Sequence, residues 1–412
     1  MALDVKAYGV TDIGRKRKRN EDAFLIDPEL GLYAVADGMG GHNAGDVASQ
    51  RAIEVVRAAV AAEVAVLRAF AADPSPAFGS AAARLLEQAI QIACADIRSM
   101  AEGDPQLRGM GTTFVGLVVA GERAIIAHVG DSRLYLYRKG ALHVLTEDHS
   151  LIADQLKAGE ITPEGAQKSP IKGVLTRVLG QHESVQVDSL VIDVIPGDAF
   201  LLCSDGLHGL LADAELSARF AAGGGEDLPA ALVAAANERG GRDNITAVVV
   251  SAADPGAEAA SATARIDVLR RIPLLEHLTY REQSEVLAIA QTRSYPSGAT
   301  VVRQGETGGD LFVVLEGVVS VEQSGTPIAM LYVGGHFGEM GLVDDLARSA
   351  SVRALGPLRA MVIGREAMLA LMQRDPTLAV KLLWAFVQVL SQRLRATNIE
   401  LSEMLSRAEP QG

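Results

Sequence analysis

The strongest constraint on the fold is a change of sequence pattern near residue 252. Before it, apolar runs of strand length alternate with two long helical patterns. After it, short apolar runs are separated by frequent glycines, and a long helical pattern covers about 376–407. The segment 252–264 between them is rich in alanine and contains Asp-Pro-Gly, a composition typical of a linker. The pattern therefore predicts one domain over 1–251 and a second over 265–412.

Each of the two domains has a periodicity that combines strands with helices, so we expect the α+β class. The predicted elements of the first domain are strands at 24–26, 32–36, 112–120, 123–129, 133–138, 198–203 and 245–250, and helices at 44–72 and 78–100. Strands on both sides of a helix pair favour layered, mostly antiparallel sheets. The polar stretch 147–182 is typical of a functional or mobile segment. In the second domain, a helical stretch over 266–291 precedes glycine-separated strands that predict a small β-roll or barrel.

Composition excludes several classes of function. The formal net charge of −13 argues against a nucleic-acid partner, because phosphate backbones need clustered Lys and Arg. The two cysteines, Cys94 and Cys203, form neither a disulfide framework nor a metal-binding spacing, as is usual in a reducing compartment. The sequence shows no secretory signal and no run of about 18 apolar residues free of charge. We therefore expect a cytoplasmic protein without a membrane partner.

Aspartates stand where several predicted strands begin or end. Asp37, Asp131 and Asp205 follow apolar runs, and Asp243 precedes one. Adjacent antiparallel strands could bring these carboxylates together at one end of a sandwich, where their mutual repulsion would require a divalent cation. Ligands that are all oxygen favour Mg²⁺ or Mn²⁺, and the lack of a Cys/His cluster in the sequence argues against zinc.

A site of this kind would be suited to phosphate chemistry. Two metals that share carboxylates can lower the pKa of a bridging water and generate a hydroxide for in-line attack on phosphorus. The phosphate oxygens also need a cation, and a guanidinium offers them bidentate donors. Arg17, which is close to Glu21 and Asp22 in the sequence, is the candidate. A single Asp-Gly is more often only a turn, so the inference depends on the ordered set of motifs.

Six motifs follow one another between residues 4 and 251. They are Thr11-Asp12-Ile13-Gly14-x-x-Arg17-x-x-Asn20-Glu21-Asp22, Asp37-Gly38-Met39-Gly40-Gly41-His42, Gly111-Thr112-Thr113, Gly130-Asp131-Ser132-Arg133, Ser204-Asp205-Gly206-Leu207 and Arg242-Asp243-Asn244-Ile245-Thr246. In this order they resemble the PPM family, the type 2C-like metal-dependent protein serine/threonine phosphatases, in its bacterial form. The resemblance implies an antiparallel β-sandwich flanked by helices, with two or three Mn²⁺ or Mg²⁺ ions in a cleft.

The same resemblance assigns roles to individual residues. The metal ligands that it implies are Asp37, the carbonyl of Gly38, Asp205 and Asp243 for the core metals, Glu21 and Asp22 as their supports, and Asp131 for a third, looser metal. Asp37, Asp205 and Asp243 would thus form the catalytic centre, and Arg17 would bind the substrate phosphate.

The motif around Met39 departs from that of the eukaryotic relatives. Those relatives place a histidine, a proposed general acid, directly after Asp-Gly. Here Met39 occupies that place and His42 comes three residues later, as in bacterial relatives, so His42 is a candidate general acid with a structural role as the alternative. The 147–182 stretch, with Val174-Leu175-Thr176-Arg177, resembles the flap that influences substrate choice, and His149 is interpreted as a flap or turn residue.

A second informative segment lies in the glycine-separated half of the chain. It reads Phe337-Gly338-Glu339-Met340-Gly341-Leu342, followed by Arg348-Ser349-Ala350-Ser351-Val352. From spacing alone, Glu339 and Arg348 could form a salt bridge across a turn. The pattern resembles the phosphate-binding cassette of cyclic-nucleotide-binding domains, over about 266–405. The resemblance implies that Glu339 holds the ribose 2′-hydroxyl, that Arg348 binds the cyclic phosphate, and that the Gly338 backbone and Ser349 add hydrogen bonds.

The long C-terminal helix has a heptad pattern. Its apolar seam consists of Leu383, Val387, Leu390, Leu394, Leu401 and Met404, with Thr397 in the same register. Steps of four and three residues favour a coiled-coil homodimer, and the alternative is a helix that packs on its own β-roll. Thr397-Asn398 resembles the base-contacting pair on the dimer helix of the catabolite activator protein, which favours cAMP over cGMP as the ligand.

These observations predict a phosphatase of phosphoserine and phosphothreonine in proteins that uses a metal-activated water and is regulated by a cyclic nucleotide. One alternative is a phosphatase whose β-roll serves only for dimerisation or docking. Another is a binding or scaffold protein whose phosphatase half is degenerate, although every expected ligand position keeps its residue.

Overall fold

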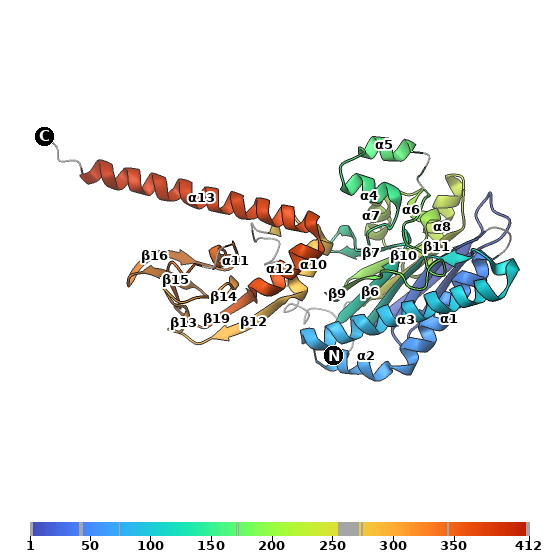
Figure 1. Cartoon of the computed structure of the whole chain (residues 1–412), viewed down its shortest axis with the longest axis horizontal. Coiled ribbons are helices and arrows are strands. Elements are labelled where there is room, and N and C mark those ends of the chain that lie inside the picture. Colours follow the sequence, from blue (N-terminus) through green and yellow to red (C-terminus); the bar gives the residue numbers. More distant parts are fainter. Residues whose placement is uncertain are drawn as a thin grey trace. The chain divides into compact units, whose positions relative to one another are not determined.

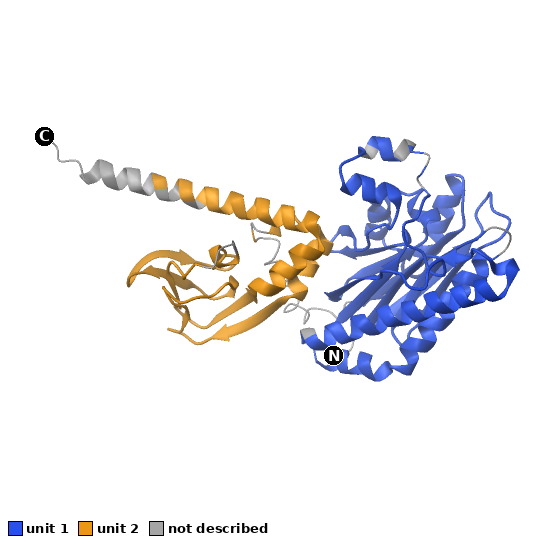
Figure 2. Cartoon of the chain, viewed as in Figure 1, with its two compact units in different colours: residues 1–259 blue, residues 260–412 orange. Residues whose placement is uncertain are grey.

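The computed structural model describes residues 3–40, 44–73, 75–169, 171, 173–253, 272, 275–343 and 346–408. The chain forms two compact units, residues 1–259 and 260–412 (Figure 2). Most of the predicted linker, 252–264, lies outside the described residues. None of the described helices combines the length and the apolar composition that a membrane-spanning segment requires.

The first unit alternates strands with helices along the chain. Its strands are β1 (Val5–Asp12), β2 (Asp22–Asp27), β3 (Leu32–Met39), β4 (Gly111–Thr112), β5 (Phe114–Ala120), β6 (Arg123–Val129), β7 (Arg133–Arg138), β8 (Ala141–Val144), β9 (Asp188–Asp193), β10 (Ala199–Cys203) and β11 (Ile245–Ala252). Its helices are α1 (Gly45–Ala62), α2 (Val64–Ala72), α3 (Pro76–Gly103), α4 (Leu151–Lys157), α5 (Pro163–Lys168), α6 (Asp205–His208), α7 (Asp213–Ala221) and α8 (Leu228–Glu238), with short 3₁₀ turns at Pro105–Leu107 and Gly225–Asp227.

These elements form a four-layer sandwich (Figure 1). One antiparallel sheet has the strand order β1-β11-β10-β7-β8, and the other has the order β2-β3-β5-β6-β9, with β4 paired to the end of β3. Strands β10 and β11 face β3 across the two sheets. Helices α1, α2 and α3 cover the second sheet, and α7 and α8 cover the first. The predicted sandwich flanked by helices is confirmed.

Strand β3 shows why the layers form. Leu32 and Ala34 belong to the apolar core that the second sheet shares with its helices. The intervening Tyr33 and Val35 are also buried, and side chains alternate between the two faces of a strand. A strand that is apolar on both faces must therefore be covered by helices on one side and by the other sheet on the opposite side.

Two predictions for this unit need correction. The helix predicted over 44–72 is two helices, because α1 ends before Glu63 and α2 begins at Val64. The 147–182 stretch contains α4 and α5 and is thus not wholly irregular. Each of these short helices begins at a hydroxyl cap, since Ser150 accepts a hydrogen bond from the Ala153 N–H and Thr162 accepts one from the Gly165 N–H.

The second unit is a β-roll with helices on one side. Its strands are β12 (Ala290–Tyr295), β13 (Thr300–Val302), β14 (Leu311–Glu316), β15 (Val319–Gln323), β16 (Thr326–Leu331), β17 (His336–Phe337), β18 (Ser351–Ala354) and β19 (Leu358–Ile363). Its helices are α10 (Tyr280–Ala288), α11 (Met340–Val343), α12 (Arg365–Arg374) and α13 (Pro376–Ala408). The antiparallel sheets β12-β19-β14-β17 and β13-β18-β15-β16 enclose an apolar core between them. The predicted helical stretch 266–291 is wrong at its end, where Ala290 already begins β12.

Helix α13 has two apolar faces with different surroundings. Leu378, Leu382 and Phe386 are buried in the core that the helices share with the first sheet of the roll. The predicted heptad seam lies elsewhere on the helix, because Val387 is 58% and Leu394 is 63% exposed. The first part of α13 thus packs on the β-roll, as the alternative interpretation expected, while the four described leucine and valine residues of the seam are exposed. The side chains of Thr397, Leu401 and Met404 lie outside the described part of the structure.

Candidate functional site

The predicted carboxylates meet at one end of the sandwich. Asp22 and Asp37 are paired across β2 and β3. Asp205 opens α6 with one residue between it and the end of β10, and Asp131 follows β6 after one glycine. Asp243 comes two residues before β11, the neighbour of β10. Five carboxylates from distant parts of the chain thus gather where their strands begin or end.

Burial and like charge act together on this group. Burial is the main cause that raises the pKa of Asp37 well above its usual range, and the charges of Asp22, Asp205, Asp131 and Asp243 raise it further. Burial also raises the pKa of Asp22 to about 6, against hydrogen bonds that favour the ionised form. Burial and the charge of Asp205 raise the pKa of Asp131 to about 7. A bound cation would relieve this repulsion.

Two buried oxygens in the group lack a donor. Asp22 Oδ2 accepts hydrogen bonds from Ser204 Oγ at 2.7 Å and from Thr246 Oγ1 at 2.6 Å. The other oxygen, Asp22 Oδ1, is buried and has no hydrogen-bond partner among the described residues, and the same holds for Asp205 Oδ1. Buried acceptors are normally satisfied, so these two oxygens fit a hard divalent cation.

Glu21 and the backbone of Gly38 lie beside these carboxylates. A Cβ on Gly38 would overlap the carbonyl oxygens of Gly45 and Glu21, so only glycine fits at this position. The Gly38 N–H donates to the Glu21 carbonyl at 3.1 Å. Burial raises the pKa of the Glu21 carboxyl, which the positive charge of Arg17 opposes. The structure therefore brings Glu21, Gly38 and the aspartates together.

Arg17 reaches the edge of the cluster. Its Nη2 donates to Asp243 Oδ2 at 2.6 Å, and its side chain is 52% exposed. Its hydrogen bond with Asp243 raises the pKa of the guanidinium, and the charges of Glu21 and Asp37 add to this effect. The guanidinium is thus accessible from solvent and adjacent to the carboxylates. His42, the candidate general acid, lies outside the described residues.

A threonine and a serine that received no role from the sequence hold Asp37 in place. Thr113 Oγ1 accepts the Asp37 N–H at 3.0 Å and shares a hydrogen bond of 2.8 Å with Ser132 Oγ. Ser132 follows Asp131 directly, so this chain of contacts connects two of the gathered aspartates. The only signal in the sequence was that Thr113 and Ser132 belong to the ordered motifs.

Asn244 holds the loop that carries Arg17 in place through hydrogen bonds to its backbone. Its Nδ2 donates to the carbonyls of Ile13 at 3.0 Å and of Arg19 at 2.8 Å. Its Oδ1 accepts the N–H of Glu21 at 2.9 Å. One buried amide therefore fixes both ends of the segment between β1 and β2 beside Asp243.

The predicted phosphate cassette lies at the end of β17 and the start of α11. Gly338 has a φ of +85°, a conformation that favours glycine, and Glu339 is buried. Arg348 donates from Nη1 to the Gly338 carbonyl at 3.2 Å and from Nη2 to the Asp310 carbonyl at 2.9 Å. The guanidinium therefore bonds to the backbone of the cassette at Gly338 and to the backbone of Asp310, just before β14. Ser349 is exposed.

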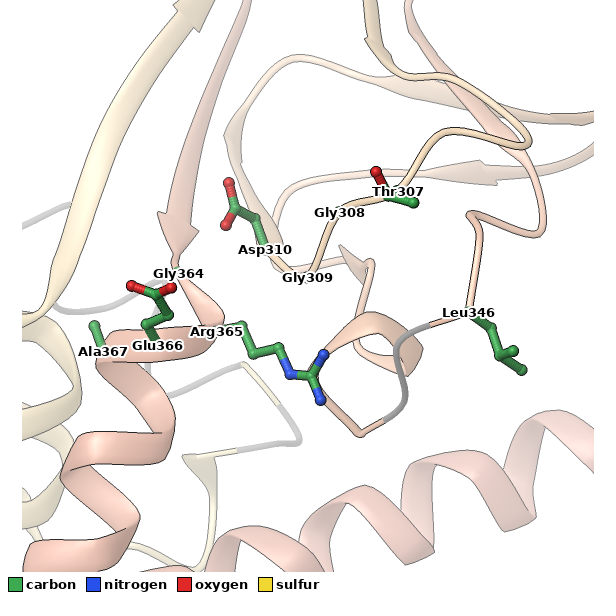
Figure 3. A pocket seen from close by; sticks show the side chains of 9 residues that line it. All are labelled: Thr307, Gly308, Gly309, Asp310, Leu346, Gly364, Arg365, Glu366 and Ala367. Atoms are coloured by element: carbon green, nitrogen blue, oxygen red, sulfur yellow. The ribbon is translucent and has the colours of Figure 1, made fainter.

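A cavity of about 770 Å³ adjoins this cassette (Figure 3). Its lining consists of Thr307, Gly308, Gly309, Asp310, Leu346, Gly364, Arg365, Glu366 and Ala367. A Cβ on Gly308 would lie 3.3 Å from Arg348 Nη2, and one on Gly309 would lie 2.8 Å from Arg365 Cβ. The glycine pair thus passes closely between the two arginines. Of the two predicted contacts on α13, the described Asn398 is exposed and is not among the lining residues.

Comparison with known proteins identifies both halves of the chain. The family model for protein phosphatase 2C matches residues 13–231, and the model for the cyclic nucleotide-binding domain matches residues 292–375. The chain belongs to the protein phosphatase 2C family. This membership confirms the resemblance that the six motifs indicated, and the second match confirms the resemblance of the β-roll.

Named relatives of this phosphatase come from several bacteria. Serine/threonine phosphatase stp of Listeria innocua is 38% identical over 247 residues, which are 58% of this chain and 93% of that protein. Protein phosphatase PhpP of Streptococcus pneumoniae is 35% identical over 257 residues, 60% of this chain and 98% of that protein. The predicted enzyme class, a protein serine/threonine phosphatase, is confirmed.

Solved structures agree with this assignment of the phosphatase unit. The serine/threonine phosphatase PstP/Ppp of Mycobacterium tuberculosis superimposes with a TM-score of 0.53 at 33% identity, covering 60% of this chain and 99% of that one. The catalytic domain of a PstP in complex with two manganese ions has a TM-score of 0.51 at 31% identity, covering 61% of this chain and 99% of that one. The matches cover the first unit, where the carboxylates gather.

Proposed function

We propose that this phosphatase removes phosphate from phosphoserine and phosphothreonine in proteins, with two or three Mn²⁺ or Mg²⁺ ions, and that a cyclic nucleotide bound to its second unit regulates it. The observation that carries the catalytic part is the group of buried, mutually repelling carboxylates with two unpartnered oxygens. A related phosphatase has two manganese ions in its structure, which supports the choice of metal. The two buried, free cysteines suit the reducing cytoplasm, where we place the protein.

Each residue of the first site has a proposed role. Asp37, the Gly38 carbonyl, Asp205 and Asp243 hold the two core metals, Glu21 and Asp22 support them, and Asp131 holds a third. When bound, these ions supply an activated water for in-line attack on phosphorus. Arg17 holds the phosphate oxygens, and its partial exposure beside Asp243 leaves donors free to face an incoming phosphate. His42 remains the candidate general acid for the leaving serine or threonine.

The first test is the metal dependence of phosphate release. The purified chain, stripped of metal, is assayed on one peptide carrying phosphothreonine and on the same peptide carrying phosphotyrosine. We expect release from phosphothreonine only with Mn²⁺ or Mg²⁺, loss of that release with EDTA, and recovery in excess metal, because the carboxylates need a cation to form the site. Full activity in the chelated sample, or activity on phosphotyrosine alone, would contradict the proposal.

The second unit has the features of a cyclic-nucleotide site. Arg348 Nη1 and Nη2 each donate to a neutral carbonyl, and a phosphate would offer them stronger, charge-assisted acceptors. Buried Glu339 is the proposed acceptor for the ribose 2′-hydroxyl, with the Gly338 backbone and Ser349 as further phosphate contacts. We favour cAMP over cGMP because Thr397 and Asn398 resemble the base-contacting pair of the catabolite activator protein.

Regulation requires that the nucleotide bind two arrangements of the chain with different affinity. Arg348 couples ligand to backbone, because a bound phosphate would draw it from the carbonyls of Gly338 and Asp310. Gly338 lies two residues before the start of the cassette helix α11, so this exchange can shift the cassette. A coupling free energy of ~1–3 kcal/mol would change activity or substrate affinity by roughly 5–150-fold. We prefer activation as its direction.

The exposed seam of α13 supports a homodimer. Leu383, Val387, Leu390 and Leu394 follow one another at steps of four, three and four, and each is 37% exposed or more. A second copy of the same helix is the occupant that a heptad seam fits, because each apolar side chain meets its equivalent. Sedimentation equilibrium of the whole chain should give twice the chain mass, and a purely monomeric species at micromolar concentration would contradict the dimer.

A further inference from the structure

His149 makes two hydrogen bonds to the residue before Asp131. Its N–H donates to the Gly130 carbonyl at 2.9 Å, and its ring Nδ1 accepts the Gly130 N–H at 3.1 Å. Both groups are buried, and Gly130 has a φ of +102° that a side chain would strain. The backbone that carries Asp131 is therefore clamped on both sides by a single histidine. The sequence suggested only a flap or turn residue at this position.

The opposite nitrogen of the ring faces an ion pair. Because Nδ1 accepts a hydrogen bond, the proton of a neutral imidazole is on Nε2. That N–H faces Asp188 Oδ2 at 3.4 Å, whereas Arg177 Nη1, itself a donor, lies 3.0 Å from Nε2 without accepting its proton. Arg177 Nη1 also donates to Asp188 Oδ1 at 2.7 Å. The ring thus connects the loop of Asp131 on one side with Arg177 and Asp188 on the other.

Arg177 belongs to the part of the 147–182 stretch around Val174-Leu175-Thr176-Arg177, here called the flap segment. The backbone of His149 contacts the same segment, since the Thr176 N–H donates to the His149 carbonyl at 2.9 Å. Ser150 pairs with Leu175 in an isolated bridge. His149 is therefore the residue at which the Asp131 loop and the flap segment are joined.

A metal site is the competing interpretation of this cluster. His128, His149 and Asp188 bring ligand atoms within 4.8 Å of one another, a combination that metal centres use. Here the guanidinium of Arg177 already donates to Asp188 at 2.7 Å and lies 3.0 Å from His149 Nε2. His128 bonds through Nε2 to the Glu147 carbonyl and stacks on the ring of His149 at 4.6 Å. Arg177 supplies the positive charge that a metal would otherwise bring.

We propose that Gly130, His149, Arg177 and Asp188 form a latch that positions both the Asp131 loop and the flap segment. His149 is a positioning residue that acts through its neighbours. The Nδ1 half of the latch sets the Asp131 carboxylate for a third metal, and the Nε2 half holds the flap segment through Arg177 and Asp188. The catalytic consequences of this proposal rest on the proposed metal-dependent phosphatase.

Two substitutions separate the halves of the latch. In His149→Asn, the amide oxygen can occupy the place of Nδ1 and still accept the Gly130 N–H, but the side chain is too short for Asp188. In His149→Gln, the amide reaches toward Asp188 and Arg177 but leaves the Gly130 N–H without an acceptor. His277→Asn and His277→Gln are matched controls. His277 belongs to the second unit, and its contact is with Gln388 of that same unit.

Hydrogen exchange of the metal-free chain tests the geometry without reference to catalysis. In His149→Gln, exchange of the Gly130 amide should quicken about fivefold or more, with the flap peptide 173–180 unchanged, as for the loss of one hydrogen bond. In His149→Asn, the flap peptide should exchange faster by a similar factor, with Gly130 unchanged. Exchange rates equal to those of the wild type in both variants would overturn the latch. Faster exchange at both Gly130 and the peptide 173–180 in both variants would overturn it as well.

The functional measurement uses the same variants with Mn²⁺ and a phosphothreonine peptide. His149→Gln should raise the Mn²⁺ concentration for half-maximal activity about fivefold, and weaken Mn²⁺ binding in calorimetry accordingly, while His149→Asn should instead raise KM for the peptide by a similar factor. Changes confined to kcat in both variants would overturn the positioning role. If the wild type itself released no phosphate, the proposed function would fail while the exchange result still decided the latch.

Discussion

Asp205→Asn and Asp37→Asn are each expected to lower kcat on a phosphothreonine peptide by two orders of magnitude or more. Each change removes one charge from the proposed metal ligands, and charge stabilisation by bound metals is worth several kcal/mol, at about 1.4 kcal/mol per factor of ten. Steady-state kinetics at saturating Mn²⁺ measure the loss. Arg17→Ala, at the edge of the same site, should act mainly on KM, because Arg17 is proposed to hold substrate rather than metal.

The free energy of unfolding of Asp205→Asn tests whether unfolding, rather than loss of metal, causes the fall in kcat. Burial, followed by the charge of Asp243, raises the pKa of Asp205 in the folded chain. A group with a raised folded pKa contributes stability that is lost as pH rises through that value. Asparagine cannot ionise, so the metal-free variant should be at least as stable as wild type at pH 7. Asp213→Asn, at the exposed start of α7, is the control and should keep full activity. Activity in Asp205→Asn near that of wild type would contradict the metal assignment.

Arg348→Ala is expected to weaken binding of cAMP to the whole chain by about 100-fold or more. Truncation of one partner of a buried, hydrogen-bonded charge pair typically costs 2–5 kcal/mol, and a cyclic phosphate would be such a partner. The structure already holds the guanidinium beside the cassette, with Nη1 at 3.2 Å from the Gly338 carbonyl and Nη2 at 2.9 Å from the Asp310 carbonyl. Isothermal titration calorimetry of the chain with cAMP and with cGMP measures the change.

Arg353→Ala provides a matched control for that experiment. Arg353 lies on β18 of the same unit, with its side chain 51% exposed and 3.8 Å from Glu322. Its loss should leave the affinity for cAMP within about twofold, as expected for an exposed ion pair of little net worth. Equal binding by the Arg348 and Arg353 variants would show that the phosphate does not bind at the cassette.

The carboxylate site was largely predictable from sequence because the positions of its aspartates follow a simple rule. Asp37, Asp131, Asp205 and Asp243 stand at the ends of apolar strands, and antiparallel pairing brings such ends together. Periodicity does not reveal which residues hold these aspartates in place. The hydrogen bond from the Asp37 backbone to Thr113 spans 76 residues, and such distant contacts have no local pattern.

Helix positions were less predictable where side-chain caps or tertiary packing decide them. Helices α4 and α5 depend on single hydroxyls, Ser150 and Thr162, within a stretch whose polarity suggested a loop. Helix α13 was assigned an apolar seam, yet a second set of apolar residues, including Leu382 and Phe386, anchors it to the β-roll. A helix with apolar residues on two faces can pack on its own β-roll and still offer a seam for a coiled coil. Periodicity alone does not select between these two interpretations.

The sequence motif of the nucleotide cassette could be predicted, but the residues that line the adjoining cavity could not. Arg348 lies where the motif implied, but Arg365 lines the adjoining cavity from the start of α12 without any motif to mark it. Its position depends on the close passage of Gly308 and Gly309 between the two arginines. Such proximity arises only when the loop before β14 is folded onto α12.

The measurement that tests the central claim most directly is a titration of cAMP and of cGMP against the Mn²⁺-dependent release of phosphate by the whole chain. Saturating nucleotide should change kcat or KM by roughly 5–150-fold, with cAMP acting at lower concentration than cGMP. Calorimetry on the same sample establishes that the nucleotide is bound. Nucleotide that binds and yet leaves both kinetic constants unchanged on several phosphopeptides would contradict regulation, and the β-roll would then be a module for dimerisation or docking.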